Sequence, residues 1–178
     1  MEPVKLNAEE KLEVYWETIG YINGLNRSSE IKAGLIISFY GLLLGVVLQV
    51  LTNMETDYKM TYFLIGVIVV FAFFVSRSIY YSFRCFLPQI EKNFNKNMFF
   101  FHDVITHYGD IDAFSKKFRK LLDKEKELYD QLGQQIYAIS LIASKKFSDV
   151  NNSVRNLVYS FIPLLVAVGI IVVEELVL

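Results

Sequence analysis

The sequence has few of the residues that build disulfides and metal sites. It holds one cysteine (Cys85), two histidines and three prolines in 178 residues. A single cysteine excludes an internal disulfide and a paired-cysteine metal site, and it suits the reducing cytosolic face of a membrane. His102 and His107 are five residues apart, which is poor spacing for two metal ligands on one helix. We therefore expect neither a metal site nor a cofactor.

The chain also lacks the short motifs of nucleotide-processing and hydrolytic enzymes. It contains no glycine-rich phosphate loop and no zinc-protease helix motif. His102 beside Asp103 is the pair that a hydrolase would use, but a pair without known geometry has little weight. The net charge is only −1, so overall charge favours no polyanionic partner. We expect no enzymatic activity and no nucleic-acid partner.

What the sequence has in abundance is apolar residues, gathered in three runs. Of all residues 53% are hydrophobic, and the runs at 33–51, 60–76 and 157–173 contain no charged residue. Runs of about 17 to 25 apolar residues match the hydrocarbon core of a bilayer at the helical rise. The sequence therefore predicts an all-α membrane protein with three transmembrane helices and a helical cytosolic module between the second and third.

These runs divide the chain into four expected parts. They are an N-terminal cytosolic helix at 1–32, a transmembrane hairpin at 33–83, a cytosolic sensing module at 84–156, and a third span with a short external tail at 157–178. No basic segment with a cleavable hydrophobic core begins the chain, so we expect the first span to be its own uncleaved insertion signal.

The basic residues predict which side of the membrane each part occupies. Of the 18 Lys and Arg residues, twelve fall in 84–156 and four precede the first span, whereas the connection at 52–59 holds only Lys59. Loops rich in Lys and Arg stay on the cytosolic side. We expect a multi-pass membrane protein with a cytosolic N-terminus, a cytosolic module and an external C-terminus.

The segment before the first span predicts an amphipathic helix, because Leu12, Ile19 and Ile22 recur at helical spacing. Trp16 on this helix is expected either at the lipid headgroups or against the central module.

The first span carries a seam of small residues. Its members are Gly34, Ser38, Gly41 and Gly45. Their spacing puts them on one helix face, where small residues let two helices approach closely in lipid. The seam is expected to form either an oligomer interface or a tight hairpin with the second span.

The second span is expected to continue as one helix through Arg84 and to end or kink at Pro88. After it, residues 98–105 predict a short helix or hinge packed against the module. Gly109 and the aspartates at 110–112 predict a turn and a helix start.

From Phe114 the apolar residues follow a helical repeat that runs into the third span, which predicts a long stalk. Gly133 and the isolated Glu125 are the weak points of this helix, which is expected either to break near Gly133 or to continue through it. Pro163 is expected to kink the third span.

Several basic residues lie where a phosphate group could be bound. Lys32, Lys145 and Lys146 flank the spans on the expected cytosolic side, and each is either a ligand contact or an ordinary positive flank. For Arg155 the flank is the favoured interpretation. Gln135, Tyr137 and Ser140 add hydrogen-bonding groups.

A planar base could stack on Phe100 or Tyr137, although core packing is the favoured role of the aromatic run at 99–101.

Short motifs along nearly the whole chain resemble a known family. In order they are Arg27-Ser-Ser-Glu-Ile-Lys-Ala-Gly34, Leu87-Pro88, Phe99-Phe-Phe-His-Asp103, Gln135-Ile-Tyr137 and Ala143-Ser-Lys-Lys-Phe147, followed by a final span. This order resembles the transmembrane effectors of Pycsar antiphage systems. Two positions depart from the family pattern: Glu30 stands where an Asp is typical, and His102 where a Gly is typical.

The resemblance implies a function and its partners. A partner pyrimidine nucleotide cyclase would make cyclic UMP or cyclic CMP, and the effector would bind it in the cytosol. The lipid bilayer of the cell inner membrane, where the resemblance places the protein, would then lose integrity in an abortive infection. A homo-oligomer is expected. The residues expected to bind the nucleotide are Arg27, Glu30, Lys32, Phe100, His102, Asp103, Gln135, Tyr137, Lys145 and Lys146. A constitutive oligomeric membrane protein and another nucleotide-gated effector of the CBASS type are the alternatives.

Overall fold

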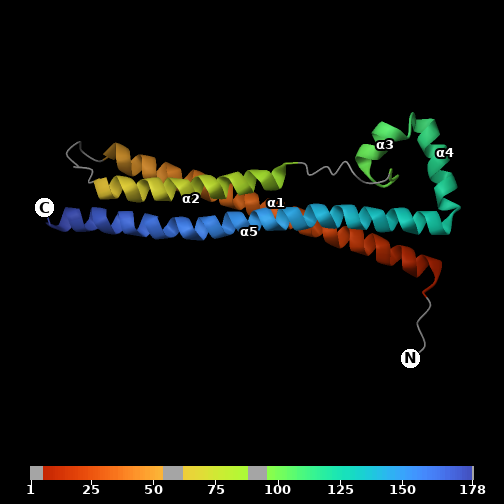
Figure 1. Ribbon diagram of the computed structural model, residues 1–178, viewed down its shortest axis with the longest axis horizontal. Coiled ribbons are helices and arrows are strands. Elements are labelled where there is room, and N and C mark those ends of the chain that lie inside the picture. Colours follow the sequence, from red (N-terminus) through yellow and green to blue (C-terminus); the bar gives the residue numbers. More distant parts are fainter. Residues whose placement is uncertain (1–5, 54–61, 88–95, 178) are drawn as a thin grey trace, which may run out of the picture. The chain divides into compact units, whose positions relative to one another are not determined.

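The computed structural model describes residues 6–53, 62–87 and 96–177, and within them it has five α-helices (Figure 1). They are α1 (Ala8–Asn53), α2 (Tyr62–Phe86), α3 (Phe101–His107), α4 (Ile111–Leu122) and α5 (Glu125–Val177). Three of them, α1, α2 and α5, are long and apolar enough to cross a membrane. The predicted class, three spanning helices with short helices between the second and third, is confirmed.

The contacts divide the chain into two compact units. The first unit comprises residues 1–27 and 88–144, and the second comprises residues 28–87 and 145–178. Helices α1 and α5 contribute residues to both units, whereas α2 belongs to the second and α3 and α4 to the first. Of the predicted connection at 52–59, residues 52–53 belong to α1, and the rest of it lies outside the described residues, as does the predicted helix end at Pro88. The predicted continuation of the second span through Arg84 is confirmed.

Side chains cap the N-termini of two helices. At the start of α1, Asn7 Oδ1 accepts from Glu10 N–H at 2.8 Å, and Glu10 Oε2 accepts from Asn7 N–H at 2.8 Å. This reciprocal pair is a capping box. At the start of α4, Asp110 Oδ1 accepts from Ala113 N–H at 2.8 Å, directly after Gly109 at φ +83°. The predicted turn and helix start at 109–112 are therefore confirmed.

The long helical stretch after Phe114 breaks at one of its two weak points. Helix α4 ends at Leu122, where the N–H of Asp123 bonds to Arg119 O, and α5 begins at Glu125. Helix α5 then continues through Gly133 and Pro163. Of the two alternatives at Gly133, the break is wrong, because a glycine costs a helix only about 1 kcal/mol and its neighbour Leu132 is fully buried. The predicted long stalk into the third span is confirmed.

The first unit is held by one apolar cluster between α1 and α5. It contains Ile19 and Ile22 from α1 and Leu132, Ile139 and Ala143 from α5. Beside it, the rings of Tyr15 and Tyr129 stack with centroids 5.4 Å apart. Trp16 meets Phe99 edge-on at 6.3 Å, so of its two predicted roles the structure shows packing against the module.

The second unit packs α1, α2 and α5 side by side (Figure 1). One layer consists of Ala33, Cys85 and Val150, one residue from each helix. The next consists of Ile36, Tyr40 and Val75, with Leu43, Phe71, Ile79 and Leu157 against it. Bulky side chains thus make the contact between α1 and α2.

The seam of small residues does not make that contact along its whole length. A Cβ added at Gly34 would lie 3.7 Å from Phe86, but one added at Gly41 or Gly45 would meet nothing within 4 Å among the described residues. Ser38, Gly41 and Gly45 are exposed. The tight-hairpin interpretation is therefore wrong for Gly41 and Gly45, and the interpretation as an oligomer interface stays a prediction.

Candidate functional site

Three serines form a fully buried hydroxyl cluster between α2 and α5 in the second unit. Ser78 Oγ donates to Ser153 O at 2.9 Å, and Ser153 Oγ donates to Ser78 O at 2.8 Å. The hydroxyls of Ser82 and Ser153 lie 2.7 Å apart. None of the three side chains is exposed. In a span, where lipid offers no hydrogen bonds, such reciprocal pairs hold neighbouring helices together.

We expect Ser153→Ala to weaken the contact of α2 with α5, because it leaves the hydroxyls of Ser78 and Ser82 buried with fewer partners. The expected loss is about 1 kcal/mol in free energy of unfolding. Unfolding in mixed micelles, followed by helix content, measures it. Ser148→Ala, at an exposed position of the same helix, is the matched control and should change nothing.

Two ion pairs lie next to the serine cluster and bind all three long helices. Lys146 on α5 donates to Glu30 on α1. Arg84 on α2 pairs with Asp149 on α5 at 3.4 Å. The Asp149 side chain is only 6% exposed and that of Lys146 12%, so both pairs are shielded from water on one side. Buried charges require such partners.

A second polar arrangement fixes the chain before α3 against α5 in the first unit. Asn97 Nδ2 donates to Gln131 O at 2.7 Å, and Met98 N–H donates to Gln131 Oε1 at 2.9 Å. Asp103 Oδ2 accepts from Asn97 N–H at 2.9 Å. The other oxygen of Asp103 lies 3.5 Å from His107 Nδ1. Asp103 therefore organises this turn and faces His107.

The phenol of Tyr108, at the end of α3, lies in the same region. Burial, followed by the carboxylates of Asp103 and Glu127, raises the pKa of Tyr108 above its ordinary value. Lys117 lies 5.5 Å from the centre of its ring. A phenol is protonated at neutral pH in any case, so the Tyr108 hydroxyl is available there as a donor.

The structure places the ten predicted nucleotide-binding residues in both units. Glu30, Lys32, Lys145 and Lys146 belong to the second unit, and Arg27, Phe100, His102, Asp103, Gln135 and Tyr137 to the first. Among the residues of the second unit, Lys146 donates a hydrogen bond to Glu30. Arg27, Lys32, His102 and Tyr137 are exposed.

Gln135 is the most informative of the predicted residues. Its Oε1 atom is buried and accepts no hydrogen bond within the described part of the chain, and the same is true of Asn26 Oδ1. An unpaired buried acceptor costs about 1 to 3 kcal/mol, so each is suited to a donor supplied from outside the chain.

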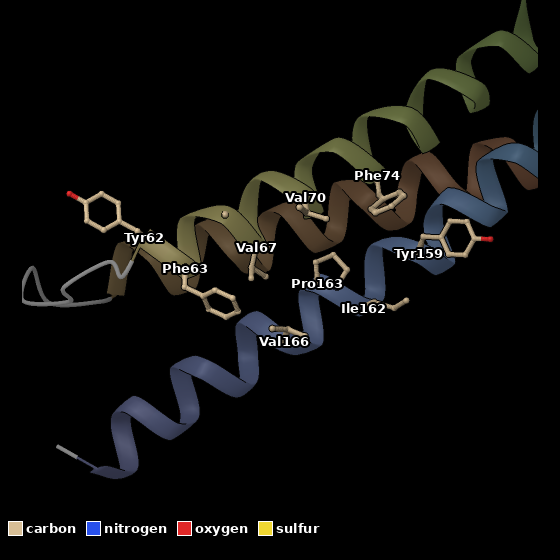
Figure 2. A pocket seen from close by; sticks show the side chains of 10 residues that line it. Tyr62, Phe63, Val67, Val70, Phe74, Tyr159, Ile162, Pro163 and Val166 are labelled. Carbon is tan, nitrogen blue, oxygen red and sulfur yellow. The ribbon is translucent and has the colours of Figure 1, made fainter.

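An apolar groove of about 640 Å³ lies between α2 and α5 in the second unit (Figure 2). Figure 2 shows Phe63, Val67 and Val70 of α2 facing it, with Pro163 and Val166 on the side of α5. No charged residue lines it. The groove suits hydrocarbon and offers nothing to a phosphate group.

The sequence analysis missed the roles of Arg84, Asp149 and the serine cluster. A usable signal was present: Ser78 and Ser82, like Asp149 and Ser153, are four residues apart, which places polar groups on one face of a helix next to apolar runs. Nothing in the local sequence marks Asn97 and Gln131 as partners, because they come from distant segments.

Comparison with known proteins identifies the family. The family model of the Pycsar effector protein domain matches residues 14–173. Comparison with curated proteins and with solved structures gave no match. The family match covers both units and all three candidate spans, and it agrees with the order of motifs in the sequence. The chain therefore belongs to the Pycsar effectors, which are cyclic-nucleotide-activated membrane effectors of antiphage defence.

Proposed function

We propose that this protein binds cyclic UMP or cyclic CMP on the cytosolic side and then impairs the integrity of the inner membrane, so that the infected cell stops growing before phage are released. The observation that carries the proposal is the family match over residues 14–173 together with three helices able to span a membrane. A pyrimidine nucleotide cyclase is the proposed source of the ligand. No chemical step by the chain itself is required.

The proposed orientation rests on the basic residues. Twelve of the 18 Lys and Arg residues lie in 84–156, which agrees with a cytosolic module, a cytosolic N-terminus and an external C-terminus. A messenger made inside the cell then reaches the first unit directly.

Unpaired acceptors support a nucleobase contact in the first unit. Gln135 Oε1 is buried without a donor, and the uracil ring offers an N–H group and the cytosine ring an amino group. Half-buried Phe100 provides an aromatic ring in the same unit. We propose Gln135 as a base contact and Phe100 as a stacking surface. Arg27, His102, Asp103 and Tyr137 stay candidates in this unit.

Dye release from vesicles tests the proposed function. The full chain is inserted into vesicles of bacterial lipid with a trapped dye, and cyclic UMP, cyclic CMP, cyclic AMP, cyclic GMP and a cyclic dinucleotide are added separately. Release with a cyclic pyrimidine nucleotide alone is expected. No release with any nucleotide, despite correct insertion, would contradict the proposal. Release with the dinucleotide would favour a CBASS-type effector, and release without any nucleotide a constitutive membrane protein.

The variant Lys32→Ala tests whether the second unit binds the phosphate group of the nucleotide. Lys32 is exposed and forms no ion pair within the described ranges, so its ammonium group is available to an anion. We expect Lys32→Ala to weaken nucleotide binding roughly tenfold to a hundredfold, the loss of one charge-assisted hydrogen bond of about 1.5–3 kcal/mol. Calorimetric titration of the solubilised full chain measures it, with Lys145→Ala and Lys146→Ala in parallel.

Arg155→Ala is the matched control for Lys32→Ala, because Arg155 is an exposed basic residue of α5 in the same unit. The Arg155→Ala variant should bind the nucleotide with the same affinity as the wild type. Equal affinity of all four variants would mean that these cations only set the orientation in the membrane.

A further inference from the structure

Helix α1 presents an acidic stripe on the first unit. Glu9, Glu13 and Glu17 are four residues apart, so they share one face over about 12 Å. All three are exposed, and none forms an ion pair within the part of the chain that the structure describes. Neighbouring Glu10 is occupied by the capping box. Three adjacent unpaired carboxylates repel one another, which favours a cationic partner.

Helix α4 presents a basic stripe on the same unit. Its members Lys116, Arg119 and Lys120 are exposed and likewise form no ion pair among the described residues. The cations beside them are engaged: Lys117 lies over the Tyr108 ring, and Lys124 bonds to Glu127 at 2.9 Å.

The opposite face of α4 packs against the rest of the first unit, so the basic stripe faces outward. Phe118 packs against Phe99 with ring centroids 5.8 Å apart and stacks on Phe114 at 5.6 Å, and Leu121 is buried. Because this aromatic face is fixed in the unit, the opposite face of α4 is available to another molecule.

Exposed apolar side chains lie beside both stripes. Ile111 and Leu122 of α4 are 80% and 51% exposed, and Trp16 and Tyr21 of α1 are 51% and 68% exposed. Ile111 and Leu122 are about three helical turns apart and therefore on the same side of α4. Covering such side chains stabilises an interface by about 25 cal/mol per Å² of apolar area.

We infer that the first units of neighbouring copies bind each other, with the acidic stripe of α1 in one copy against the basic stripe of α4 in the next. Both halves are carried by one chain and have opposite charge, so the partner that they fit is a second copy. The charges set partner and register, and the apolar side chains supply most of the affinity.

This contact joins two different surfaces, so it repeats from copy to copy. It gives rings or filaments unless a two-fold axis satisfies both contacts at once. The inference does not rest on which nucleotide the protein binds.

Charge reversal with cross-rescue tests this contact. The mass of the solubilised full chain is measured by light scattering, without nucleotide, for Lys116→Glu/Lys120→Glu and for Glu13→Lys/Glu17→Lys. Each variant alone sets like charges against each other, and we expect self-association to weaken about tenfold or more. An equimolar mixture of the two variants restores opposite charges at every contact and should assemble again, as should one chain that carries all four changes.

Lys96→Glu/Lys126→Glu is the matched control, since it reverses two exposed lysines of the first unit outside the stripe and should assemble as the wild type does. A monomeric wild type, unchanged assembly of either reversed variant, or failure of the mixture to recover overturns the inference. Because no ligand is present, these outcomes are independent of the dye-release result.

Discussion

Arg84→Leu is expected to lower the free energy of unfolding of the second unit by about 3 kcal/mol. The reason is the carboxylate of Asp149, whose side chain is 6% exposed and whose ion pair to Arg84 spans 3.4 Å. Removing the cation leaves a buried charge without its partner, and in comparable pairs this costs about 3–5 kcal/mol. Arg84 is itself 43% exposed, so water partly replaces it, and the lower end applies. Denaturant titration in micelles, followed by helix content, measures the loss.

Two further variants isolate the ion pair. Arg77→Leu removes an exposed arginine from the same helix, where it lies 5.7 Å from the Phe73 ring, and should cost less than 1 kcal/mol. The double change Arg84→Leu/Asp149→Leu removes both charges and should recover most of the stability. If it were as unstable as Arg84→Leu, packing of the arginine stem and not the unpaired carboxylate would be the cause.

Leu132→Ala is expected to destabilise the first unit by about 2–5 kcal/mol. Leu132 has no exposed surface and lies in the cluster with Ile19, Ile22 and Ile139, so truncation leaves a cavity that helices on both sides cannot close. We expect nucleotide binding to be lost at temperatures where the second unit stays folded. Limited proteolysis shows the loosening of the first unit, and calorimetric titration shows the lost binding.

Leu122→Ala is the control for this variant. It makes the same change at a leucine that is 51% exposed, and the expected cost is below 1 kcal/mol. Equal proteolysis of Leu132→Ala and the wild type would show that the cluster around Leu132 is not the core of the first unit.

Local rules predicted the helices well. The three apolar runs are long enough to be recognised by length alone, and the cap at Asp110 follows from an aspartate after a glycine. The alternative of a break at Gly133 is wrong because propensity is a weak term in a helix whose next residue, Leu132, is buried in the core.

The candidate site was only partly predictable. Glu30 and Lys146 were both named as site residues, yet they are 116 positions apart, and no local rule predicts that they bond to each other. Lys146 has two alternative interpretations from the sequence, a phosphate contact or an ordinary positive flank, and in the structure its ammonium group donates to Glu30. Its role in nucleotide binding stays a prediction, and an incoming anion would have to compete with that carboxylate.

The reciprocal bonds of Ser78 and Ser153 limit how α2 can travel along α5. A shift of α2 by one residue relative to α5 would rotate the Ser78 hydroxyl away from Ser153 by about 100°. Both hydroxyls would then be buried without a hydrogen-bond partner. Ser82 stands one turn, about 5.4 Å, further along α2 and already lies 2.7 Å from Ser153. If α2 moved along α5, the favoured step would therefore be one whole helical turn, after which Ser82 would take the place of Ser78 opposite Ser153. Smaller translations would leave these hydroxyls without partners.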